Sequence, residues 1–353
     1  MKRRNSKVIS VGGIQIGGGA PIRVQSMCCT DTRDVKATLG QINALSDAGC
    51  EIVRLAVPDM EAATALHEIR KASPVPLVAD IHFDWRLALE AVKAGIDKIR
   101  INPGNIGEAA RVRTVADACK SAGIPIRIGV NGGSLDKEIL QKYGSVCPEA
   151  LVESALQHVE LLNQCDFDDI CISIKVSNVP KTIAAYRLLA EQTAYPLHLG
   201  VTETGTAQMG SIKSAVGIGS LLCDGIGDTI RVSLTADPVE EVYCAQRILH
   251  ACGLSQETPE LISCPTCGRC RIELIQIATE VEKRLKEIHA PLKIAVMGCA
   301  VNGPGEAREA DVGMAGGNRE GLLFRKGEIV KKVPMDSIVD ELIALAKNVA
   351  EES

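Results

Sequence analysis

Residues 48–54 read Ala48-Gly49-Cys50-Glu51-Ile52-Val53-Arg54, and their pattern of a glycine, a short gap and an apolar stretch carrying a basic residue returns along the chain. The further copies are Ala94-Gly95 before Lys98-Ile99-Arg100, Ala122-Gly123 before Pro125-Ile126-Arg127, and Gly225 and Gly227 before Thr229-Ile230-Arg231. Glycine suits the position just after a helix, where the backbone needs a positive φ. The repeat therefore predicts helices that end in glycine, each followed by a strand that carries an arginine.

Eight β-rich segments fit this repeat between residues 22 and 235, and each interval between them has room for a helix and two loops. They are Ile22–Cys28, Glu51–Val57, Pro76–His82, Lys98–Gly104, Pro125–Asn131, Asp169–Asn178, Pro196–Glu203 and Asp228–Thr235. Eight strand–helix units of this size predict a (β/α)8 TIM barrel in the α/β class. An open doubly wound sheet is the alternative. We favour the barrel because no Gly-x-Gly-x-x-Gly motif opens the first unit.

A length of 353 residues indicates one large domain and a smaller one. We expect residues 1–255 to form the barrel, with an N-terminal hairpin around Gly12-Gly13 that closes its bottom. Residues 253–263 have the composition of a linker. Residues 256–353 are expected to form an α+β domain, with a strand at Lys293–Met297, a hairpin at Lys326-Gly327 and a last helix that begins near Asp336 or Ser337.

Composition excludes several classes of function. The net charge is −5 and only eight residues are aromatic, so neither a basic field nor a set of stacking platforms for nucleic acid is present. No run of about 18 apolar residues predicts a membrane span, and the basic N-terminus is not followed by the apolar core of a signal peptide. We therefore expect a cytoplasmic protein, in which clustered cysteines are metal ligands rather than disulfides.

Polar side chains lie on strands that a purely structural barrel would keep apolar. Five cations occupy five different predicted strands: Arg54, Arg100, Arg127, Lys175 and Arg231. Further polar residues lie at or near strand carboxyl ends: Asp80, His82, Asn102, Asn131, Asn178, His198 and Glu203. Buried charges are costly unless paired or used, and barrel active sites form at the strand carboxyl ends. The pattern predicts a site for a polyanion with two phosphoryl groups. The alternative is pairing with Asp80 and Glu203, or exposure to water.

A cysteine cluster marks the second domain. Residues 264–270 read Cys-Pro-Thr-Cys-Gly-Arg-Cys, and residues 298–306 read Gly-Cys-Ala-Val-Asn-Gly-Pro-Gly-Glu. A Cys-x-x-Cys pair with a further cysteine on a glycine-rich loop indicates a metal centre. Structural zinc normally uses two such pairs, and the second is missing here. An iron–sulfur cluster needs four ligands, and several combinations of these residues would supply them.

Together with residues 98–105 (Lys-Ile-Arg-Ile-Asn-Pro-Gly-Asn) and 197–203 (Leu-His-Leu-Gly-Val-Thr-Glu), these motifs resemble the 4-hydroxy-3-methylbut-2-en-1-yl diphosphate synthase family, in its compact bacterial two-domain form. The resemblance covers essentially the whole chain. It implies reductive ring opening and dehydration of 2-C-methyl-D-erythritol 2,4-cyclodiphosphate to 4-hydroxy-3-methylbut-2-enyl diphosphate, in the methylerythritol phosphate route to isoprenoids. It also implies a homodimer that receives electrons from flavodoxin or ferredoxin.

The resemblance further implies a [4Fe–4S] cluster held by Cys264, Cys267, Cys299 and Glu306. On this interpretation the barrel residues that bind substrate are Arg54, Asp80, Arg100, Asn102, Arg127, Asn131, Lys175 and Arg231. We expect Glu203 to be the acid that protonates the departing hydroxyl. His82 and His198 are expected to position phosphate or substrate hydroxyls.

One cysteine departs from the family pattern. Cys270 follows Cys267 by three residues and competes with Glu306 for the fourth ligand position. We predict that Cys270 is not a ligand, because an enzyme that binds substrate at iron needs one exchangeable ligand, and a carboxylate exchanges more readily than a thiolate. A fourth thiolate would instead suit an electron carrier.

Two other classes of protein remain as alternatives. A pterin-dependent barrel synthase or methyl transferase would use similar polar strand ends but would not need the cysteine domain. A non-catalytic iron–sulfur electron carrier, or a zinc-stabilised binding protein, would not need five cations in the barrel.

Overall fold

The computed structural model describes residues 2–255, 259–285, 287–288, 290–299, 308–317 and 319–352. The chain divides into two compact units, Met1–Cys252 and Gly253–Ser353. Glu306 lies outside the described residues. No helix in the described ranges is both long and apolar enough to cross a membrane.

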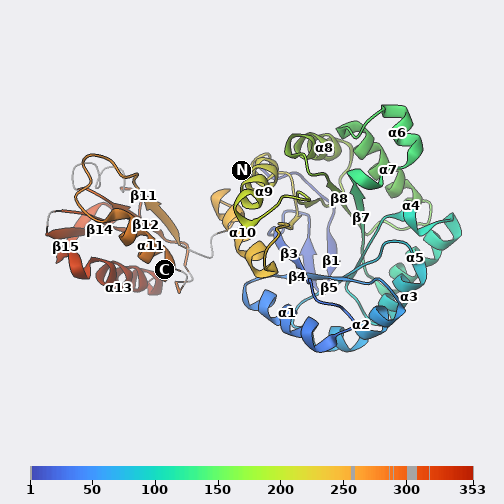
Figure 1. Cartoon of the computed structure of the whole chain (residues 1–353), viewed down its shortest axis with the longest axis horizontal. Helices are drawn as coiled ribbons and strands as arrows, with labels where there is room; N and C mark the ends of the chain where they lie inside the picture. Colours follow the sequence, from blue (N-terminus) through green and yellow to red (C-terminus); the bar gives the residue numbers. More distant parts are fainter. Residues whose placement is uncertain are drawn as a thin grey trace. The chain divides into compact units, whose positions relative to one another are not determined.

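The first unit is a ring of parallel strands enclosed by helices (Figure 1). The strands are β3 (Arg23–Met27), β4 (Ile52–Ala56), β5 (Leu77–Asp80), β6 (Lys98–Ile101), β7 (Ile126–Asn131), β8 (Ile170–Lys175), β9 (His198–Leu199) and β10 (Thr229–Ile230). Their order is β8-β7-β6-β5-β4-β3-β10-β9, and a parallel bridge between Ile172 and Leu197 joins β8 to β9. The sheet is therefore closed, and the predicted TIM barrel is confirmed.

Helices follow the strands and form the outer layer of the barrel. They are α1 (Val35–Asp47), α2 (Met60–Ala72), α3 (Trp85–Lys93), α4 (Pro103–Ile106), α5 (Ala109–Ala122), α6 (Lys137–Tyr143), α7 (Pro148–Asn163), α8 (Val179–Gln192), α9 (Ala207–Cys223) and α10 (Pro238–Ala251). Aspartates cap several of them; Asp34, for example, accepts the backbone N–H of Ala37. The glycines of the repeat do follow helices, with φ of +90° at Gly49 and +66° at Gly123.

Several predicted strands are too long: β6, β9 and β10 occupy only part of the predicted segments Lys98–Gly104, Pro196–Glu203 and Asp228–Thr235. The segment Lys98–Gly104 was expected to be extended throughout, but β6 ends at Ile101. The side chain of Asn102 accepts the backbone N–H of Gly104 and caps the short helix α4, in which proline occupies the first turn. Proline at the start of a helix is favourable because its missing N–H needs no partner there.

The predicted N-terminal hairpin lies at the amino-terminal end of the barrel. Strands β1 (Ile9–Val11) and β2 (Ile14–Ile16) are antiparallel, and β1 lies near the barrel axis in Figure 1. The turn residues Gly12 and Gly13 have φ of +56° and +87°, which favour glycine. The apolar face of the hairpin packs against buried residues early in the barrel strands. This cluster consists of Ile9, Val11, Ile16, Ile52, Val78 and Cys171. The hairpin therefore gives the barrel an apolar floor.

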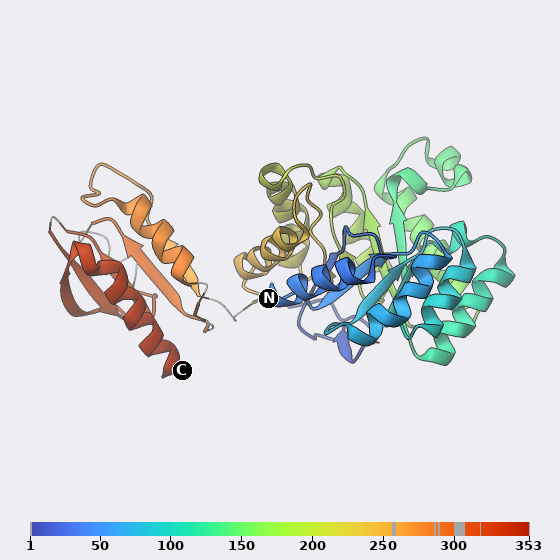
Figure 2. The same cartoon turned by 60° about the horizontal axis from the view of Figure 1, so that its bottom comes forward.

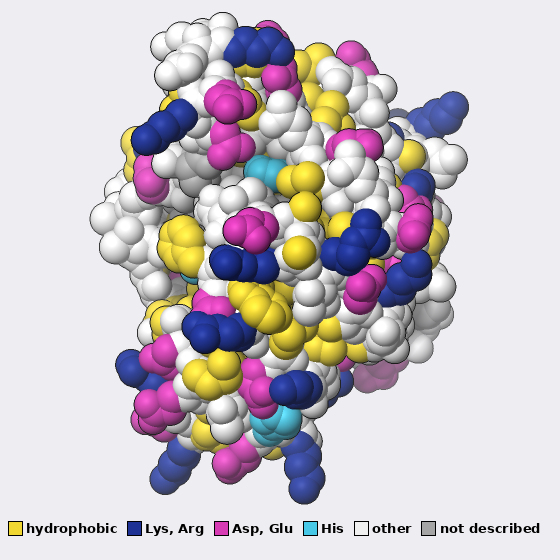
Figure 3. Space-filling model, turned by 90° about the vertical axis from the view of Figure 1, so that its right-hand side faces the viewer, with side chains coloured by type: hydrophobic (Ala, Val, Ile, Leu, Met, Phe, Trp, Pro, Cys, Tyr) yellow, Lys and Arg dark blue, Asp and Glu magenta, His cyan; other side chains and the backbone are white. Residues whose placement is uncertain are grey.

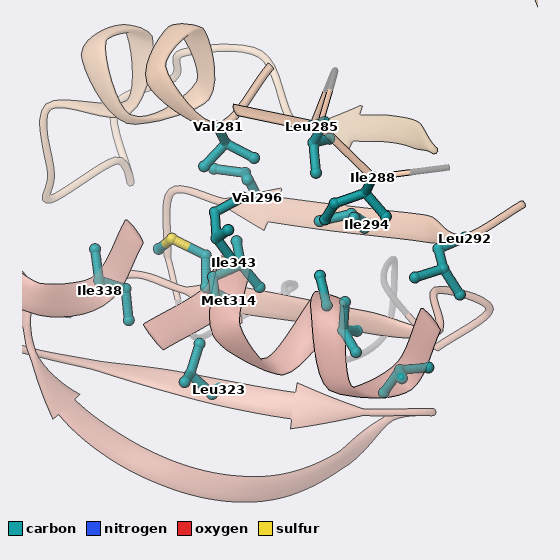
Figure 4. Packing of buried hydrophobic residues seen from close by; sticks show 14 of the residues in the cluster. Val281, Leu285, Ile288, Leu292, Ile294, Val296, Met314, Leu323, Ile338 and Ile343 are labelled. Atoms are coloured by element: carbon teal, nitrogen blue, oxygen red, sulfur yellow. The ribbon is translucent and has the colours of Figure 1, made fainter. Parts of the chain in front are cut away.

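The second unit has a mixed sheet with both of its longer helices on one face (Figure 2). Its elements are β11 (Glu260–Ser263), α11 (Leu274–Leu285), β12 (Lys293–Met297), β13 (Val312–Ala315), β14 (Glu320–Arg325), β15 (Glu328–Pro334) and α13 (Ile338–Glu351). The order is β11-β12-β13-β14-β15; the first two pairings are parallel and the last two antiparallel. Figure 4 shows the core, in which Val281, Ile343 and Val296 pack between the helices and the sheet.

The hairpin, the strand at 293–297 and the last helix of this unit agree with the sequence prediction, but the linker prediction is too long. Residues 260–263 form β11, which pairs in parallel with β12. Strand β11 lies at the edge of the sheet and is only partly buried, so it lacks the continuous apolar run that would have indicated a strand.

The protein surface mixes charges of both signs. Figure 3 shows a face on which Lys and Arg side chains alternate with Asp and Glu side chains, and apolar groups lie between them. This face carries no extended field of one sign. Within the described residues, a concentration of positive charge does lie inside the barrel.

Candidate active site and metal centre

Five cationic side chains meet inside the barrel. Arg54, Arg100, Arg127 and Lys175 lie on β4, β6, β7 and β8, and Arg231 follows β10 directly. Nη1 of Arg127 donates to Oε1 of Gln25 on β3 at 3.1 Å. Because β3 and β7 are not neighbours in the sheet, this bond crosses the barrel interior. Only 1% of Arg127 and 8% of Lys175 is exposed, so these charges are removed from water.

Asp80 is the carboxylate that holds two of these arginines. Its oxygens lie 3.7 Å from Nε of Arg54 and 3.2 Å from Nη1 of Arg100. His82 Nε2 is 3.6 Å from the same carboxylate, and the His82 side chain is 55% exposed. Burial works against ionisation of Asp80, but Arg54, His82 and Arg100 outweigh it and hold the pKa of the carboxyl below its ordinary value. Asp80 is therefore ionised at neutral pH.

Arg231 has a partner that the sequence prediction missed. Glu241, on the first turns of α10, receives two bonds from the Arg231 guanidinium, at 3.2 Å from Nε and 3.1 Å from Nη2. Glu241 is 4% exposed and also accepts from Ser26. The suggestion that Glu203 neutralises the barrel cations is not supported, because Glu203 is exposed on the loop after β9. The spacing of residues along the sequence carries no signal for this pairing.

His198 lies deeper than expected. We predicted a place near the carboxyl end of its strand, but His198 is the first residue of the short strand β9 and is fully buried. Its Nδ1 is 2.8 Å from Oγ1 of Thr229, and its Nε2 is 3.5 Å from Nζ of Lys175. Burial, then Arg127 and Lys175, lowers the pKa of His198 well below its ordinary value. A neutral imidazole can thus orient Lys175 without adding charge.

A sixth cation, Lys98, was not selected from the sequence. It is fully buried at the start of β6, on the same strand face as Arg100, and among the described residues its Nζ has no hydrogen-bond partner. Burial, followed by repulsion from Arg127 and Arg54, lowers the pKa of Lys98 to about 8. The alternation of side chains along Lys98-Ile99-Arg100 would have identified it.

The remaining predicted residues lie at the rim formed by the strand carboxyl ends. Asn131 ends β7 and is the register partner of Lys175. Asn178 caps α8 through the backbone N–H of Lys181, as Asn102 caps α4. Glu203 has a φ of +55°, a conformation that is unfavourable for a residue with a Cβ and that concentrates at functional sites.

The cysteines of the second unit gather at one edge of its sheet. Cys264 follows β11 and Cys299 follows the neighbouring parallel strand β12. The Sγ of Cys264 accepts the backbone N–H of Gly298 at 3.2 Å. Cys267 is exposed, and hydrogen bonding from the backbone and then the side chain of Arg269 lowers the pKa of its thiol. Thiolates that receive N–H donors are the chemistry of iron–sulfur ligands, so the donor set fits such a cluster.

The described residues do not form a complete metal-binding centre. Within the described ranges no three His, Cys, Asp or Glu side chains surround a common metal position, and the predicted ligand Glu306 falls outside those ranges. Cys270 lies in the same region, where its Sγ is 3.3 Å from the carbonyl oxygen of Ile272 and packs close to Gly298.

Comparison with known proteins identifies this combination of units. The family model described as the GcpE TIM-barrel domain matches residues 6–246, and the GcpE protein C-terminal domain matches residues 260–348. The 4-hydroxy-3-methylbut-2-en-1-yl diphosphate synthase (flavodoxin) of Ruminiclostridium cellulolyticum is 61% identical over 97% of this chain and 97% of its own length. The chain belongs to the GcpE family of 4-hydroxy-3-methylbut-2-en-1-yl diphosphate synthases. The resemblance seen in the sequence is confirmed.

Further comparisons relate this GcpE family member to a second synthase and to a solved structure of another enzyme. The synthase of the same name from Geobacter sulfurreducens is 61% identical over 99% of both chains. Among solved structures, dihydropteroate synthase from Stenotrophomonas maltophilia matches 70% of this chain and 98% of its own, with 14% identity and a TM-score of 0.51. That likeness shows a shared fold and no more.

Proposed function

We propose that the barrel carries out the reaction of its family by binding a cyclic diphosphate, 2-C-methyl-D-erythritol 2,4-cyclodiphosphate, and converting it to 4-hydroxy-3-methylbut-2-enyl diphosphate. The observation that carries the proposal is the excess of positive charge inside the barrel. Arg54, Arg100, Arg127, Lys175 and Arg231 converge there, whereas Asp80 and Glu241 are the carboxylates bonded to them within the described part of the chain. A bound diphosphate would offset repulsion that the free barrel must otherwise bear.

The carboxylates of Asp80 and Glu241 set the orientation of the arginines that they contact. Asp80 draws Arg54 and Arg100 together, and Glu241 fixes Arg231 through two parallel bonds. Guanidinium groups held in this way lose little freedom when they bind phosphoryl oxygens. Asn102 and Asn131, at the ends of β6 and β7, are proposed to contact the substrate as well.

Glu203 is proposed as the proton donor. Loss of the substrate hydroxyl as water requires a proton, and Glu203 stands at the strand ends, where barrels place catalytic groups. Its left-handed backbone sets the direction in which the Cα–Cβ bond leaves the chain. His82, beside Asp80 and Arg100, is proposed to position a phosphoryl group at the rim, and neutral His198 to position Lys175 from below.

Cys264, Cys267, Cys299 and Glu306 are proposed to hold a [4Fe–4S] cluster. When bound, this cluster supplies electrons one at a time for the reduction. The lowered pKa of the Cys267 thiol and the N–H donated to Cys264 favour its binding. The relatives' name specifies flavodoxin, and we propose a flavodoxin, or a ferredoxin in its place, as the electron donor. We further propose a homodimer that works in the reducing cytoplasm.

The deciding experiment is an anaerobic assay of the reconstituted protein with the cyclodiphosphate and a strong one-electron reductant. The expected result is formation of the linear diphosphate, together with broad visible absorption near ~410 nm. A colourless protein that binds zinc would contradict the cluster. A coloured protein that transfers electrons but never converts the cyclodiphosphate would favour the electron-carrier alternative.

A further inference from the structure

Two thiols outside the proposed site lie side by side where the first unit ends. Cys223 is the last residue of α9 and Cys252 caps the carboxyl end of α10. Their Sγ atoms are 3.9 Å apart, and the two helices pack against each other. Neither residue takes part in the barrel site or in the cysteine cluster of the second unit. The pair therefore has no role in the reaction proposed above.

The two sulfurs differ in access and in how firmly they are held. Cys223 is exposed, so a reagent in solution can reach it. Cys252 is half-buried, and its Sγ lies 3.8 Å from the carbonyl oxygen of Gly219, one turn before Cys223 on α9. A disulfide has an S–S distance of about 2.05 Å. Forming the bond therefore requires the two sulfur atoms to approach from their separation of 3.9 Å, and the exposed Cys223 side chain is the one with more room to move.

We propose that Cys223 and Cys252 form a thiol–disulfide modification site that responds to low-molecular-weight disulfides. The Cys223 thiolate attacks the small disulfide, forms a mixed disulfide and releases one small thiol. The Cys252 sulfur then attacks Cys223, closes the protein disulfide and releases the second small thiol. Two protein thiols are oxidised by two electrons, and one small disulfide is reduced to two thiols.

The surroundings of the two thiols make formation of the protein disulfide slow. Cys252 lies at the carboxyl end of α10, where the helix dipole disfavours a thiolate. Burial, and then the neighbouring Cys223, raises the pKa of Cys252 to about 11. The pair would therefore stay reduced through brief exposure to a small disulfide and close only when that exposure is sustained.

The disulfide would act on a defined part of the fold. The loop that it closes contains β10, Arg231 and α10 with Glu241, so it encloses one complete ion pair of the barrel site. Cys252 is also the last residue of the first unit, and Gly253 begins the second. Oxidation thus fixes the final strand–helix unit to α9 at the point where the chain leaves the barrel. A bond that closes a loop restricts the unfolded chain and stabilises the barrel.

The test uses the full-length, cluster-containing protein, incubated without oxygen with oxidised glutathione. Free thiols are then alkylated, and the unreduced digest is analysed by mass spectrometry. The expected result is a cross-link between Cys223 and Cys252 that dithiothreitol reverses, with thermal unfolding of the barrel raised by several degrees. Cys223→Ser and Cys252→Ser should each lose the cross-link and the shift, whereas Cys29→Ser, which removes another exposed thiol, should retain both.

The wild-type cross-link map decides the proposal even if a variant fails to fold. Glutathione attached to Cys223 with Cys252 still reduced at equilibrium would overturn it. So would a shift in unfolding temperature that persists in Cys252→Ser. Because neither readout depends on turnover, these outcomes stay separate from failure of the proposed enzymatic function.

Discussion

Arg100 and Arg127 are register partners on the neighbouring parallel strands β6 and β7, so two guanidinium-bearing side chains project side by side from one face of the sheet. Both residues are buried. Such a pair is unfavourable in the free protein, because each charge repels the other where water cannot screen it. The same pair becomes favourable when a diphosphate binds against the two guanidinium groups inside the barrel. Stability and binding should therefore respond in opposite directions when one member is removed.

The substitution Arg127→Met tests whether stability and substrate binding change in opposite directions. The expected result is a free barrel that is at least as stable as the wild type, since a buried like charge is replaced by an apolar chain. Affinity for the cyclodiphosphate should fall by about 1.5–3 kcal/mol, the range for hydrogen bonds to charged groups. Calorimetry of unfolding and of binding measures the two quantities. Arg113→Met, on the exposed side of α5, is the matched control and should change neither. Unchanged affinity in Arg127→Met would refute the anion site.

Lys98→Met should remove a pH dependence. The pKa of Lys98 is lowered to about 8 in the folded barrel, whereas an unfolded lysine titrates near ~10.4. Between these values the unfolded chain binds more protons, so the wild-type free energy of unfolding rises with pH. The variant should lack this rise and be more stable at pH 7, by on the order of 2–3 kcal/mol. Denaturation at several pH values measures it, with exposed Lys93→Met as control. Equal slopes in Lys98→Met and wild type would show that Lys98 does not titrate in this range.

Glu203 allows its carboxyl group and its backbone to be tested separately. Glu203→Gln keeps the side-chain shape and should retain substrate binding and iron, but lose about 10²–10⁴-fold in turnover if the carboxyl group delivers the proton. Glu203→Gly suits the φ of +55° better and should fold at least as stably, yet be equally inactive. Substantial turnover in Glu203→Gln would exclude the proposed role.

The fourth cluster ligand can be decided by substitution. Cys270→Ser should retain iron, visible absorption and turnover, because the Cys270 sulfur lies against the carbonyl of Ile272 and Gly298. Cys264→Ser, Cys267→Ser and Cys299→Ser should each lose the cluster. Glu306→Ala should leave a labile cluster with little turnover. Iron analysis and absorption spectra measure these results. Loss of the cluster in Cys270→Ser, with full activity in Glu306→Ala, would reverse the assignment.

The barrel was predictable because its signal is local and repeated. A glycine with positive φ after a helix, followed by a strand with an arginine, occurs at Gly49, Gly95, Gly123 and Gly225. The five cations were predictable for the same reason, since four have a fixed place in a strand and Arg231 directly follows one. The strand ending at Ile101 was extended too far because Asn102 caps a helix that only four residues form.

Contacts between side chains on elements far apart in the sequence were harder to predict. Glu241 reaches Arg231 from α10, and Gln25 reaches Arg127 across the barrel. Neither contact leaves a trace in local spacing, because both depend on how the barrel closes. The depth of His198 depends on the short strand β9, whose start the apolar run Pro196–Glu203 does not mark. Strand β11 was missed because an edge strand is only partly buried and needs few apolar residues, so its sequence does not stand out as a strand.

The hairpin beneath the barrel affects how the substrate enters the site and how the product leaves it. Ile9, Val11 and Ile16 fill the lower end with apolar atoms. An anion drawn to the cations must then arrive through the mouth at the strand carboxyl ends, and the product must depart the same way. Capture of the next molecule therefore waits for release of the last one. Because the apolar floor closes the lower end, release of a highly charged product away from the cations that bind it is expected to limit the rate of the catalytic cycle.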